Sequence, residues 1–388
     1  MASTHNTHNI PNTPIFRKKD EKIFNEFCKN NNNEYTPIIL PTKRHVFAIG
    51  DLHGDYKLTL NILIDVIKVI DKSFNWILPN TYVVQVGDQL DNCRPNGKSC
   101  KHMQETDSEY SDSNVAEDIK ILELFTELDV KAREHDSRVI SLFGNHELMN
   151  VQGYMDYVSY SDIIKFSNNV PGVDRYKDGK ENRKEQFKPG NKYANFMACT
   201  RIPVVIIGNF MFVHAGIIKP FIDKLNIENA DDLYKISYLI RKWLLKSINK
   251  NNVIDIITSP PHSMFWDRIL GSIPHNAHID DPICDENLKQ VLELFKMDKM
   301  IIGHTPQCFA NGHKGINSTC SGKLWRIDFG GSFSFNKADE YYSISENSSD
   351  IHASREPQVL YIKYNHDGDK EEACVKVLKK GSTLVCGK

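Results

Sequence analysis

One pattern recurs along this chain of 388 residues: a short apolar run ends at a glycine and is followed by a side chain that can bind a metal. Its first instance, Val46–Asp55, reads VFAIGDLHGD and places Asp51 and His53 just after Gly50. An apolar run that stops at glycine is typical of a buried strand followed by a loop. Asp51 and His53 are two positions apart, so an extended loop can turn both toward one metal ion. Aspartate and histidine beside glycine also serve as turn and capping residues, so this stretch alone does not settle the matter.

Later apolar runs end in the same way, and the complete pattern predicts a metal centre. In a sheet whose strands alternate with helices, the strand ends meet at one edge, where α/β proteins place their chemistry. The metal-competent side chains are Asp51, His53, Asp88, Asn145, His214 and His304. They suit two ions about 3.5 to 4 Å apart, with Asp88 as the bridge. We expect Asp51 and His53 to complete one ion's ligands, and the remaining three side chains to complete those of the other ion.

The segments between these runs predict the fold class. Residues 60–67 and 116–134 have the apolar spacing of amphipathic helices that cover a sheet. Residues 204–213 predict a hairpin that turns at Gly208 and Asn209, and residues 359–378 predict another near the C-terminal end. Strands and helices in this order predict an α/β protein with two packed sheets and helices outside them.

Length and local composition give the expected domain organisation. We expect a flexible or peripheral N-terminal extension over residues 1–43, with one short helix, and a catalytic domain over residues 44–388. Two polar, irregular segments interrupt the pattern at about 93–115 and 151–200, and we interpret them as inserted loops. The first is expected to be a surface loop or a lid, and the second a cap of helices and loops on the substrate side.

Charge and hydropathy indicate the expected setting of the protein. The formal net charge of −2 gives no global basic field that would draw the chain to nucleic acid or to an acidic membrane. No apolar run approaches the ~18 residues that span a bilayer, and no secretory signal is seen at the N-terminus. We therefore expect a cytoplasmic protein with neither nucleic acid nor membrane as a partner. The oligomeric state is not indicated.

The nine cysteines form an odd and scattered set, which does not predict a disulfide framework. We expect most of them to be reduced. Two pairs, Cys93 with Cys100 and Cys308 with Cys320, each flank a loop. Three interpretations stay open for each pair: a regulatory disulfide, a small zinc site, or two unrelated thiols.

Five strings in the order GDLHGD, GDQLD, GNHE, VHAGI and GHTPQ resemble the pattern of the calcineurin-like metallophosphoesterases, in particular their phosphoprotein phosphatase branch. The resemblance covers about Val46 to Phe335. Within that branch, GNHELMN and the LWRIDFG after GHTPQ are most similar to the bacterial-type Shewanella-like phosphatases. The resemblance implies a four-layer α/β/β/α sandwich and hydrolysis of phosphoserine, phosphothreonine or phosphotyrosine in a protein or peptide.

The resemblance also implies a mechanism and assigns roles to matching residues. Two divalent ions, which can be manganese, iron or zinc with manganese favoured in vitro, share a hydroxide that attacks phosphorus in line. His146 would protonate the leaving alkoxide, and Asp91 would hydrogen-bond the other ring nitrogen of His146. Arg268, in MFWDR, resembles the arginine whose planar fork holds phosphate oxygens.

The chain departs from the family pattern after Asp91. Asn92 stands where the family usually has an arginine, and the nearest arginine is Arg94. Either Arg94 makes the phosphate contact or that contact is lost, and its loss motivates an alternative, a metal-binding pseudophosphatase. A second alternative is a dinucleoside polyphosphate hydrolase, because the HAGI string at His214 is also seen in diadenosine tetraphosphate hydrolases.

Overall fold

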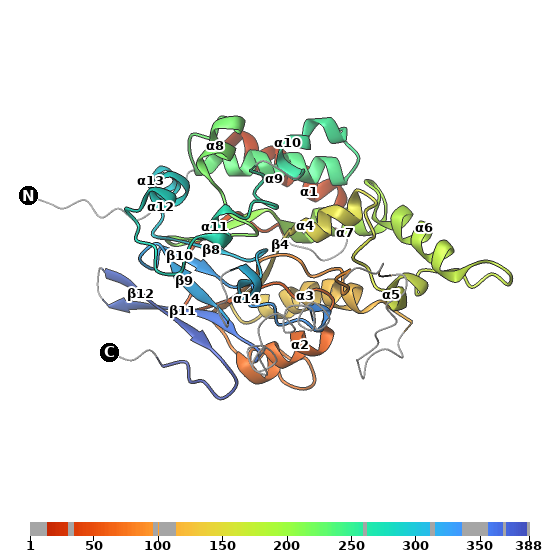
Figure 1. Ribbon diagram of the computed structural model, residues 1–388, viewed down its shortest axis with the longest axis horizontal. Helices are drawn as coiled ribbons and strands as arrows, with labels where there is room; N and C mark the ends of the chain where they lie inside the picture. The colour runs from red at the N-terminus through yellow and green to blue at the C-terminus, as the bar shows by residue number, and fades with distance from the viewer. Residues whose placement is uncertain are drawn as a thin grey trace, which may run out of the picture.

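Two six-stranded sheets form the centre of the protein in the computed structural model (Figure 1). The structure describes residues 14–29, 35–95, 100, 114–258, 262–310, 315–335, 356–367 and 370–385. The first sheet has the order β12-β11-β2-β3-β4-β5 and the second β1-β6-β7-β8-β10-β9. Both sheets are mixed, since each contains parallel and antiparallel neighbours.

The first sheet is built on the opening apolar run. Strands β2, β3, β4 and β5 run parallel, and β11 adds antiparallel to β2 before it turns into β12. The three central parallel strands are almost wholly buried, as expected for strands covered on both faces. The strands are β2 (His45–Ile49), β3 (Thr81–Gln85), β4 (Arg138–Leu142), β5 (Arg201–Ile202), β11 (Val359–Asp367) and β12 (Lys370–Leu378).

The second sheet contains the predicted hairpin. Strands β6 and β7 pair antiparallel, and Gly208 at their turn has a φ of 58°, which glycine adopts without strain. Strands β7, β8 and β10 are parallel, so their carboxyl ends meet at one edge. The strands are β1 (Ile39–Leu40), β6 (Val204–Ile207), β7 (Phe210–Val213), β8 (Lys299–Ile302), β9 (Asn317–Thr319) and β10 (Leu324–Arg326).

Helices form the outer layers. Figure 1 shows α2 and α3 along one side of the strands and α8, α9 and α10 along the other. The helices are α2 (Tyr56–Leu60) with a π-helical turn (Asn61–Val66), α3 (Glu117–Arg133), α8 (Lys219–Leu225), α9 (Ala230–Leu244), a 3₁₀ turn (Lys250–Asn252), α10 (Ile254–Ile257), α11 (Ile269–Ser272), α12 (Pro282–Cys284), a π-helical turn (Asp285–Lys289), α13 (Gln290–Phe295), α14 (Gln307–Ala310) and a 3₁₀ turn (Phe333–Phe335). One hydrophobic cluster runs through both sheets and their helices. The predicted α/β/β/α sandwich is confirmed.

The segment after β4 is helical. It contains α4 (Asn145–Val151), α5 (Tyr160–Ile164), α6 (Arg175–Phe187) and α7 (Lys192–Thr200), and α5 and α6 project at one end of the molecule (Figure 1). Although α6 is mostly charged, Arg183 and Phe187 on it are fully buried. Of the segment predicted at 93–115, residues 96–99 and 101–113 lie outside the described residues.

The N-terminal helix expected near residues 23–27 is present as α1 (Pro14–Phe27) and lies against α9 and α7. Asp20 on α1 forms a buried ion pair with Arg241 on α9. Cys28, which directly follows the helix, forms a disulfide with Cys199 on α7. Residues 1–13 of the extension that we expected to be flexible or peripheral lie outside the described residues.

The expectation that most cysteines are reduced is wrong. Disulfides join Cys28 to Cys199, Cys93 to Cys100 and Cys284 to Cys320, and Cys374 is also disulfide-bonded. Two of these pairs are 171 and 36 residues apart, so only the fold brings their sulfurs together. Of the two pairs singled out from the sequence, the first is a disulfide, whereas Cys320 bonds to Cys284 instead of Cys308.

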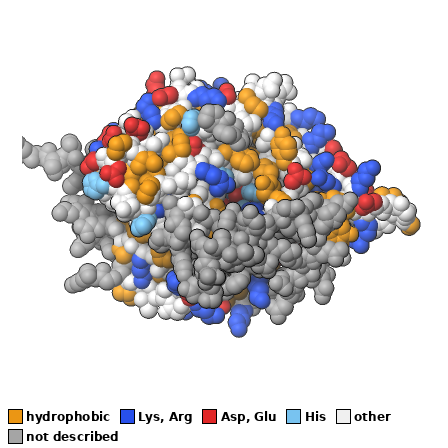
Figure 2. Space-filling view, in the orientation of Figure 1, with side chains coloured by type: hydrophobic (Ala, Val, Ile, Leu, Met, Phe, Trp, Pro, Cys, Tyr) orange, Lys and Arg blue, Asp and Glu red, His pale blue; other side chains and the backbone are white. Residues whose placement is uncertain are grey.

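The surface is of mixed charge on the face that can be viewed. Figure 2 shows lysine and arginine side chains interspersed with aspartate and glutamate over the described part of that face. None of the helices in the described ranges is both long and apolar enough to cross a membrane.

Candidate active site

Asp51 and His53 lie in the loop that follows β2. Both carboxylate oxygens of Asp51 accept a hydrogen bond from the backbone N–H of His304, at 3.1 and 3.0 Å. His53 has a φ of 44°, and its Nδ1 lies 3.3 Å from the carbonyl oxygen of Leu90. Its Nε2 lies 3.8 Å from Oδ2 of Asp51. The loop thus directs Nε2 of His53 and the carboxylate of Asp51 toward one point.

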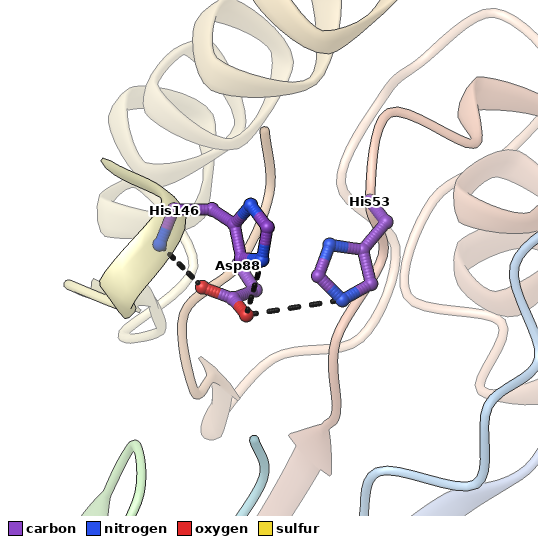
Figure 3. A group of neighbouring side chains, drawn as sticks. All are labelled: His53, Asp88 and His146. Carbon is purple, nitrogen blue, oxygen red and sulfur yellow. Dashed lines mark hydrogen bonds and ion pairs between the residues drawn. The ribbon is translucent and has the colours of Figure 1, made fainter. Parts of the chain in front are cut away.

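Asp88, after β3, is the centre of the arrangement (Figure 3). Its Oδ2 lies 3.8 Å from Nε2 of His53 and 3.9 Å from Nε2 of His146, and its Oδ1 lies 3.4 Å from Nε2 of His214. Asp88 has a φ of 57°, which is uncommon for a residue other than glycine. A Cβ on Gly144 would come within 2.1 Å of Oδ1 of Asp88, so the glycine is needed for this close approach.

The second sheet contributes His214 after β7 and His304 after β8. Nδ1 of His214 lies 2.9 Å from the carbonyl oxygen of Val86, and its Nε2 lies 3.0 Å from Oδ1 of Asn145. Nε2 of His304 lies 3.1 Å from the carbonyl oxygen of Trp266. Its Nδ1 is buried and has no hydrogen-bond partner among the described residues. A buried ring nitrogen without a partner is what a metal ligand looks like before the metal is added.

Burial and neighbouring charges shift the pKa values of several site residues. Burial raises the pKa of Asp51, and the carboxylates of Asp328 and Asp88 raise it further. Burial acts in the same direction on Asp88, but His214 and the other site histidines outweigh it and hold the pKa of Asp88 well below its usual range. Asp88 in turn raises the pKa of His214 against the effect of burial. Several carboxylates kept together out of water favour a cation at their centre.

These residues fit two metal ions. The ligand atoms of His53, Asp88 and His146 lie within 4.8 Å of one another, and so do those of Asp88, His214 and His304. Asp88 belongs to both groups, as a bridging carboxylate must. Carboxylate, imidazole and amide oxygen together suit manganese, iron or zinc. Four of the six side chains nominated as ligands belong to these groups, and the first group also contains His146, which was expected to be the acid. Asp51 joins the cluster through its contacts with His53 and the His304 N–H, and Asn145 through its contact with His214.

His146, at the start of α4, pairs with Asp91. Its Nδ1 lies 2.7 Å from Oδ2 of Asp91, and its backbone N–H donates to Oδ1 of Asp88 at 3.0 Å. Asp91 has a φ of 68° and is fully buried, and its Oδ1 accepts a hydrogen bond from Nδ2 of Asn150 at 2.7 Å. The other ring nitrogen of His146 faces the metal-competent cluster.

The arginine expected directly after Asp91 is replaced by Asn92, and an arginine two positions later, Arg94, reaches the site. Asn92 turns away from the site: its Nδ2 donates to Oδ2 of Asp162 at 2.9 Å, and its Oδ1 accepts from the Ser159 N–H at 3.1 Å. Arg94 occupies the site instead, with its guanidinium carbon 4.9 Å from the centre of the Phe335 ring and 5.6 Å from that of Tyr157.

A cavity of about 340 Å³ opens over the site. It is lined by His53, Asp88, Arg94, Asn145, His146, Met149, Tyr157, Trp266, Arg268, His304, Pro306 and Phe335. Arg268 is exposed on its wall and donates to the carbonyl oxygen of His304 at 3.0 Å. Both arginines therefore border the same space as His146.

Asp328 is a site residue that the sequence analysis missed. It follows β10, is buried, and burial raises its pKa to about 6. Its Oδ2 has no hydrogen-bond partner within the described part of the chain. The signal was present in the sequence, because Leu324–Ile327 has the alternating pattern of a strand and is followed by aspartate and two nearby glycines. The aromatic residues of the cavity wall had no comparable signal, since they come from irregular segments.

The comparison with protein families agrees with this site. The profile of the family described as "Calcineurin-like phosphoesterase" matches residues 44–308, which is more than half of the chain. The protein belongs to this family of metallophosphoesterases, and is accordingly a hydrolase that uses divalent metal ions.

Similar proteins place the chain within the family, in the phosphoprotein phosphatase branch beside the Shewanella-like phosphatases. Shewanella-like protein phosphatase 2 of Arabidopsis thaliana is 25% identical over 329 residues, which are 77% of this chain and 74% of that one. Shewanella-like protein phosphatase 1 of Plasmodium berghei is 26% identical over 76% of this chain and 69% of its own length. An uncharacterised protein, R398 of Acanthamoeba polyphaga mimivirus, is 40% identical over 53% of this chain and 86% of its own.

Solved structures show the same fold. The crystal structure of a cold-active protein-tyrosine phosphatase from a psychrophilic Shewanella species has a TM-score of 0.56 and 18% sequence identity. The similarity covers 89% of this chain and 83% of that one.

Proposed function

We propose that this protein is a phosphoprotein phosphatase that hydrolyses the phosphomonoesters of phosphoserine, phosphothreonine or phosphotyrosine. The observation that carries the proposal is the His146–Asp91 pair beside Asp88, because it adds a proton donor to a cluster of metal-competent side chains in one cavity. A phosphomonoester needs both features: cations for its negative charge and an acid for its leaving oxygen.

The metal ligands in this proposal are the six side chains at the strand ends. Asp51, His53 and Asp88 would hold one ion, and Asp88, Asn145, His214 and His304 would hold the other. When bound, the two divalent ions, manganese, iron or zinc, lower the pKa of water and neutralise the charge on the phosphate. The protein's own part is to keep these ligands fixed, which the backbone N–H of His304 does for Asp51 and the carbonyl of Val86 does for His214.

His146 is the general acid in this proposal. Asp91 accepts from Nδ1, so the ring keeps Nε2 for the reacting side, where it can deliver a proton to the leaving oxygen. An alkoxide from phosphoserine leaves poorly without that proton. A phenolate from phosphotyrosine depends on it less, because it is the weaker base.

Arg94 and Arg268 bind the phosphate oxygens in this proposal. Both line the cavity, and a guanidinium offers two parallel N–H donors to phosphate. Asn92 forms its hydrogen bonds with Asp162 and Ser159 instead, so Arg94 supplies the contact that an arginine at position 92 would make. This argues against a pseudophosphatase, whose motivation was the missing arginine.

The partner in this proposal is a phosphorylated protein or peptide. The cavity has aromatic walls at Tyr157, Trp266 and Phe335, which suit the flat ring of phosphotyrosine as well as smaller phosphorylated side chains. This is consistent with the similar Shewanella structure, whose protein is described as a tyrosine phosphatase. A cytoplasmic location remains a prediction, and the disulfides call for a direct test of it, because such bonds usually form in oxidising compartments.

The test uses metal-free protein to which manganese, iron or zinc is restored one at a time. The substrates are phosphoserine, phosphothreonine and phosphotyrosine peptides, 4-nitrophenyl phosphate and diadenosine tetraphosphate. We expect turnover of at least one phosphopeptide. Cleavage of diadenosine tetraphosphate without phosphopeptide turnover would instead favour the dinucleoside polyphosphate hydrolase. Residual activity unchanged in His146→Gln would favour the pseudophosphatase.

A further inference from the structure

The Asp91–His146 pair is held by a buried network that reaches into the helical segment after β4. Asn150 donates through Nδ2 to Oδ1 of Asp91 at 2.7 Å and to the backbone carbonyl of His146 at 2.9 Å. Its own Oδ1 accepts a hydrogen bond from Nε of Arg183 at 2.9 Å. All four of these residues have little or no exposure to solvent. The side chain of Asp91 is thus fixed by a chain of contacts that ends at Arg183.

A second branch of the network fixes the backbone of Asp91. Arg183 forms two hydrogen bonds with Asp118 on α3, Nη1 to Oδ1 at 3.2 Å and Nη2 to Oδ2 at 2.6 Å. Oδ2 of Asp118 also accepts the backbone N–H of Asp91 at 3.3 Å. Asp91 has the left-handed φ of 68°, a conformation that persists only where the surroundings impose it. Asp118 therefore supports a strained loop and is itself oriented by Arg183.

Arg183 is held rigidly and carries a charge. Its guanidinium lies over the rings of Phe166 and Phe187, with centroid distances of 5.1 and 5.0 Å. Burial alone would lower the pKa of Arg183, but Asp118 and then Asp91 outweigh burial and raise it. The Nη2 atom of Arg183 is also 3.8 Å from Oδ1 of Asp91, close enough for direct attraction. The planar guanidinium donates through Nε to Asn150 and through Nη1 and Nη2 to Asp118, an arrangement of three nitrogens that lysine, with its single nitrogen, cannot reproduce.

We infer that Arg183 is a positioning residue for catalysis: through Asn150 and Asp118 it orients Asp91, and through Asp91 it aims the ring of His146 at the leaving oxygen. The inference rests on the proposed role of His146 as general acid. It gives α6 a part in the chemistry although none of its residues lines the cavity. A misplacement of about 1 Å in a reacting group costs on the order of 10²-fold in rate, so small shifts are measurable.

The dependence on the leaving group tests this inference. A phosphoserine peptide releases an alkoxide that needs a proton, whereas 4-nitrophenyl phosphate releases a stable phenolate that does not. We expect Arg183→Gln to lower kcat on the phosphoserine peptide about 10- to 100-fold and kcat on 4-nitrophenyl phosphate less than about threefold. An equal loss on both substrates, or no loss on either, would overturn the inference.

Two comparison variants separate the possible failures. Arg241→Gln also breaks a buried arginine–aspartate pair, with Asp20, which does not line the cavity, and should not change the ratio of the two rates. His146→Gln should show the same selectivity as Arg183→Gln, and more strongly. If His146→Gln is unselective, the proposed acid fails; if it is selective and the Arg183 variant is not, only the present inference fails.

A readout without turnover completes the test. The Nδ1–H of His146, hydrogen-bonded to Asp91, should give a downfield proton resonance in wild-type protein and in Arg241→Gln, and a weakened or lost one in Arg183→Gln. Because Arg183→Gln leaves Asp118 buried without its cation, it can fail to fold. The double variant R183M/D118N removes both charges and serves as the second form. An unchanged resonance in a folded Arg183 variant would also overturn the inference.

Discussion

The strand-end loops and the helical segment of residues 145–200 contribute to the same site by different physical routes. The loops place ligands within a few residues of a buried strand, so the backbone itself determines where Asp51 and Asp88 lie. The helical segment acts over a distance, through hydrogen bonds from α4, α5 and α6 to the loop that carries Asp91 and Asn92. Metal binding thus depends on local chain geometry, whereas the acid depends on tertiary packing.

The difference predicts which substitutions separate the two functions. Changes in the loops should remove metal and activity together. Changes in the helical segment beyond the proposed ligand Asn145 should leave metal in place and alter the acid or the stability of the protein.

The largest effect is expected for Asp88→Asn. Asp88 belongs to both candidate ligand groups, so its loss should empty or disorder both metal positions. Loss of metal stabilisation worth several kcal/mol corresponds to a fall in kcat on the order of 10³-fold or more. Metal content by elemental analysis and initial rates on 4-nitrophenyl phosphate measure it. Asp156→Asn, an exposed carboxylate, is the control; full metal content in Asp88→Asn would contradict the bridging role.

The next effect is expected for Arg94→Gln, at the boundary between the two regions. Loss of one charge-assisted phosphate contact costs about 1.5 to 3 kcal/mol, which is about 10- to 150-fold in kcat/KM. Metal content should not change. Asn92→Ala is the matched control, because Asn92 contacts Asp162 and not the cavity. A larger loss in the Asn92 variant than in the Arg94 variant would reverse the assignment of the phosphate contact.

A third prediction concerns Asp162 on α5 and is a change in stability. Burial and the carboxylate of Asp118 raise its pKa to about 7, so its ionisation is less favourable in the folded protein than in the unfolded chain. The stability it contributes is present at low pH and is lost as pH rises through about 7. As the pH rises from 5 to 8, the free energy of unfolding of Asp162→Asn should increase by about 2 kcal/mol relative to that of wild type. Urea unfolding at both pH values measures this, and a parallel pH dependence of the two proteins would disprove it.

The smallest effect is expected at His45, at the start of β2 and away from the strand-end loop. Burial first, and then Arg44 and Lys363, lower its pKa to about 4. Its contribution to stability is therefore present above the ordinary histidine pKa of about 6.5 and is lost as pH falls toward 4. Because His45 is only half-buried, solvent screening reduces the effect to about 1 kcal/mol. His45→Gln should lose less stability than wild type between pH 7 and 5 in thermal unfolding, with activity at pH 7 unchanged.

What the sequence could reveal follows the same division. His214 and His304 could be nominated because each ends an apolar run, and strand order brings their positions to one edge. The network of Arg183 could not, because α6 is a charged helix whose sequence gives no sign that one of its arginines is buried. Nor could the sequence show that Arg94 lines the cavity and Asn92 does not. Both residues closely follow Asp91 in the chain, and only the directions of their side chains in the structure separate them. The disulfides Cys28–Cys199 and Cys284–Cys320 could not be predicted either, because only the fold brings these cysteines together.

The bond between Cys28 and Cys199 closes a covalent ring around the part of the chain that holds Asp51, His53, Asp88 and His146. His214 and His304 lie outside this ring. A protease that cuts one peptide bond anywhere between the two cysteines therefore leaves its products attached through sulfur. Such nicked protein should migrate as a single band on a denaturing gel until a reductant is added. A single cut within the ring therefore does not separate the fragments that carry Asp51, His53, Asp88 and His146 from the rest of the protein.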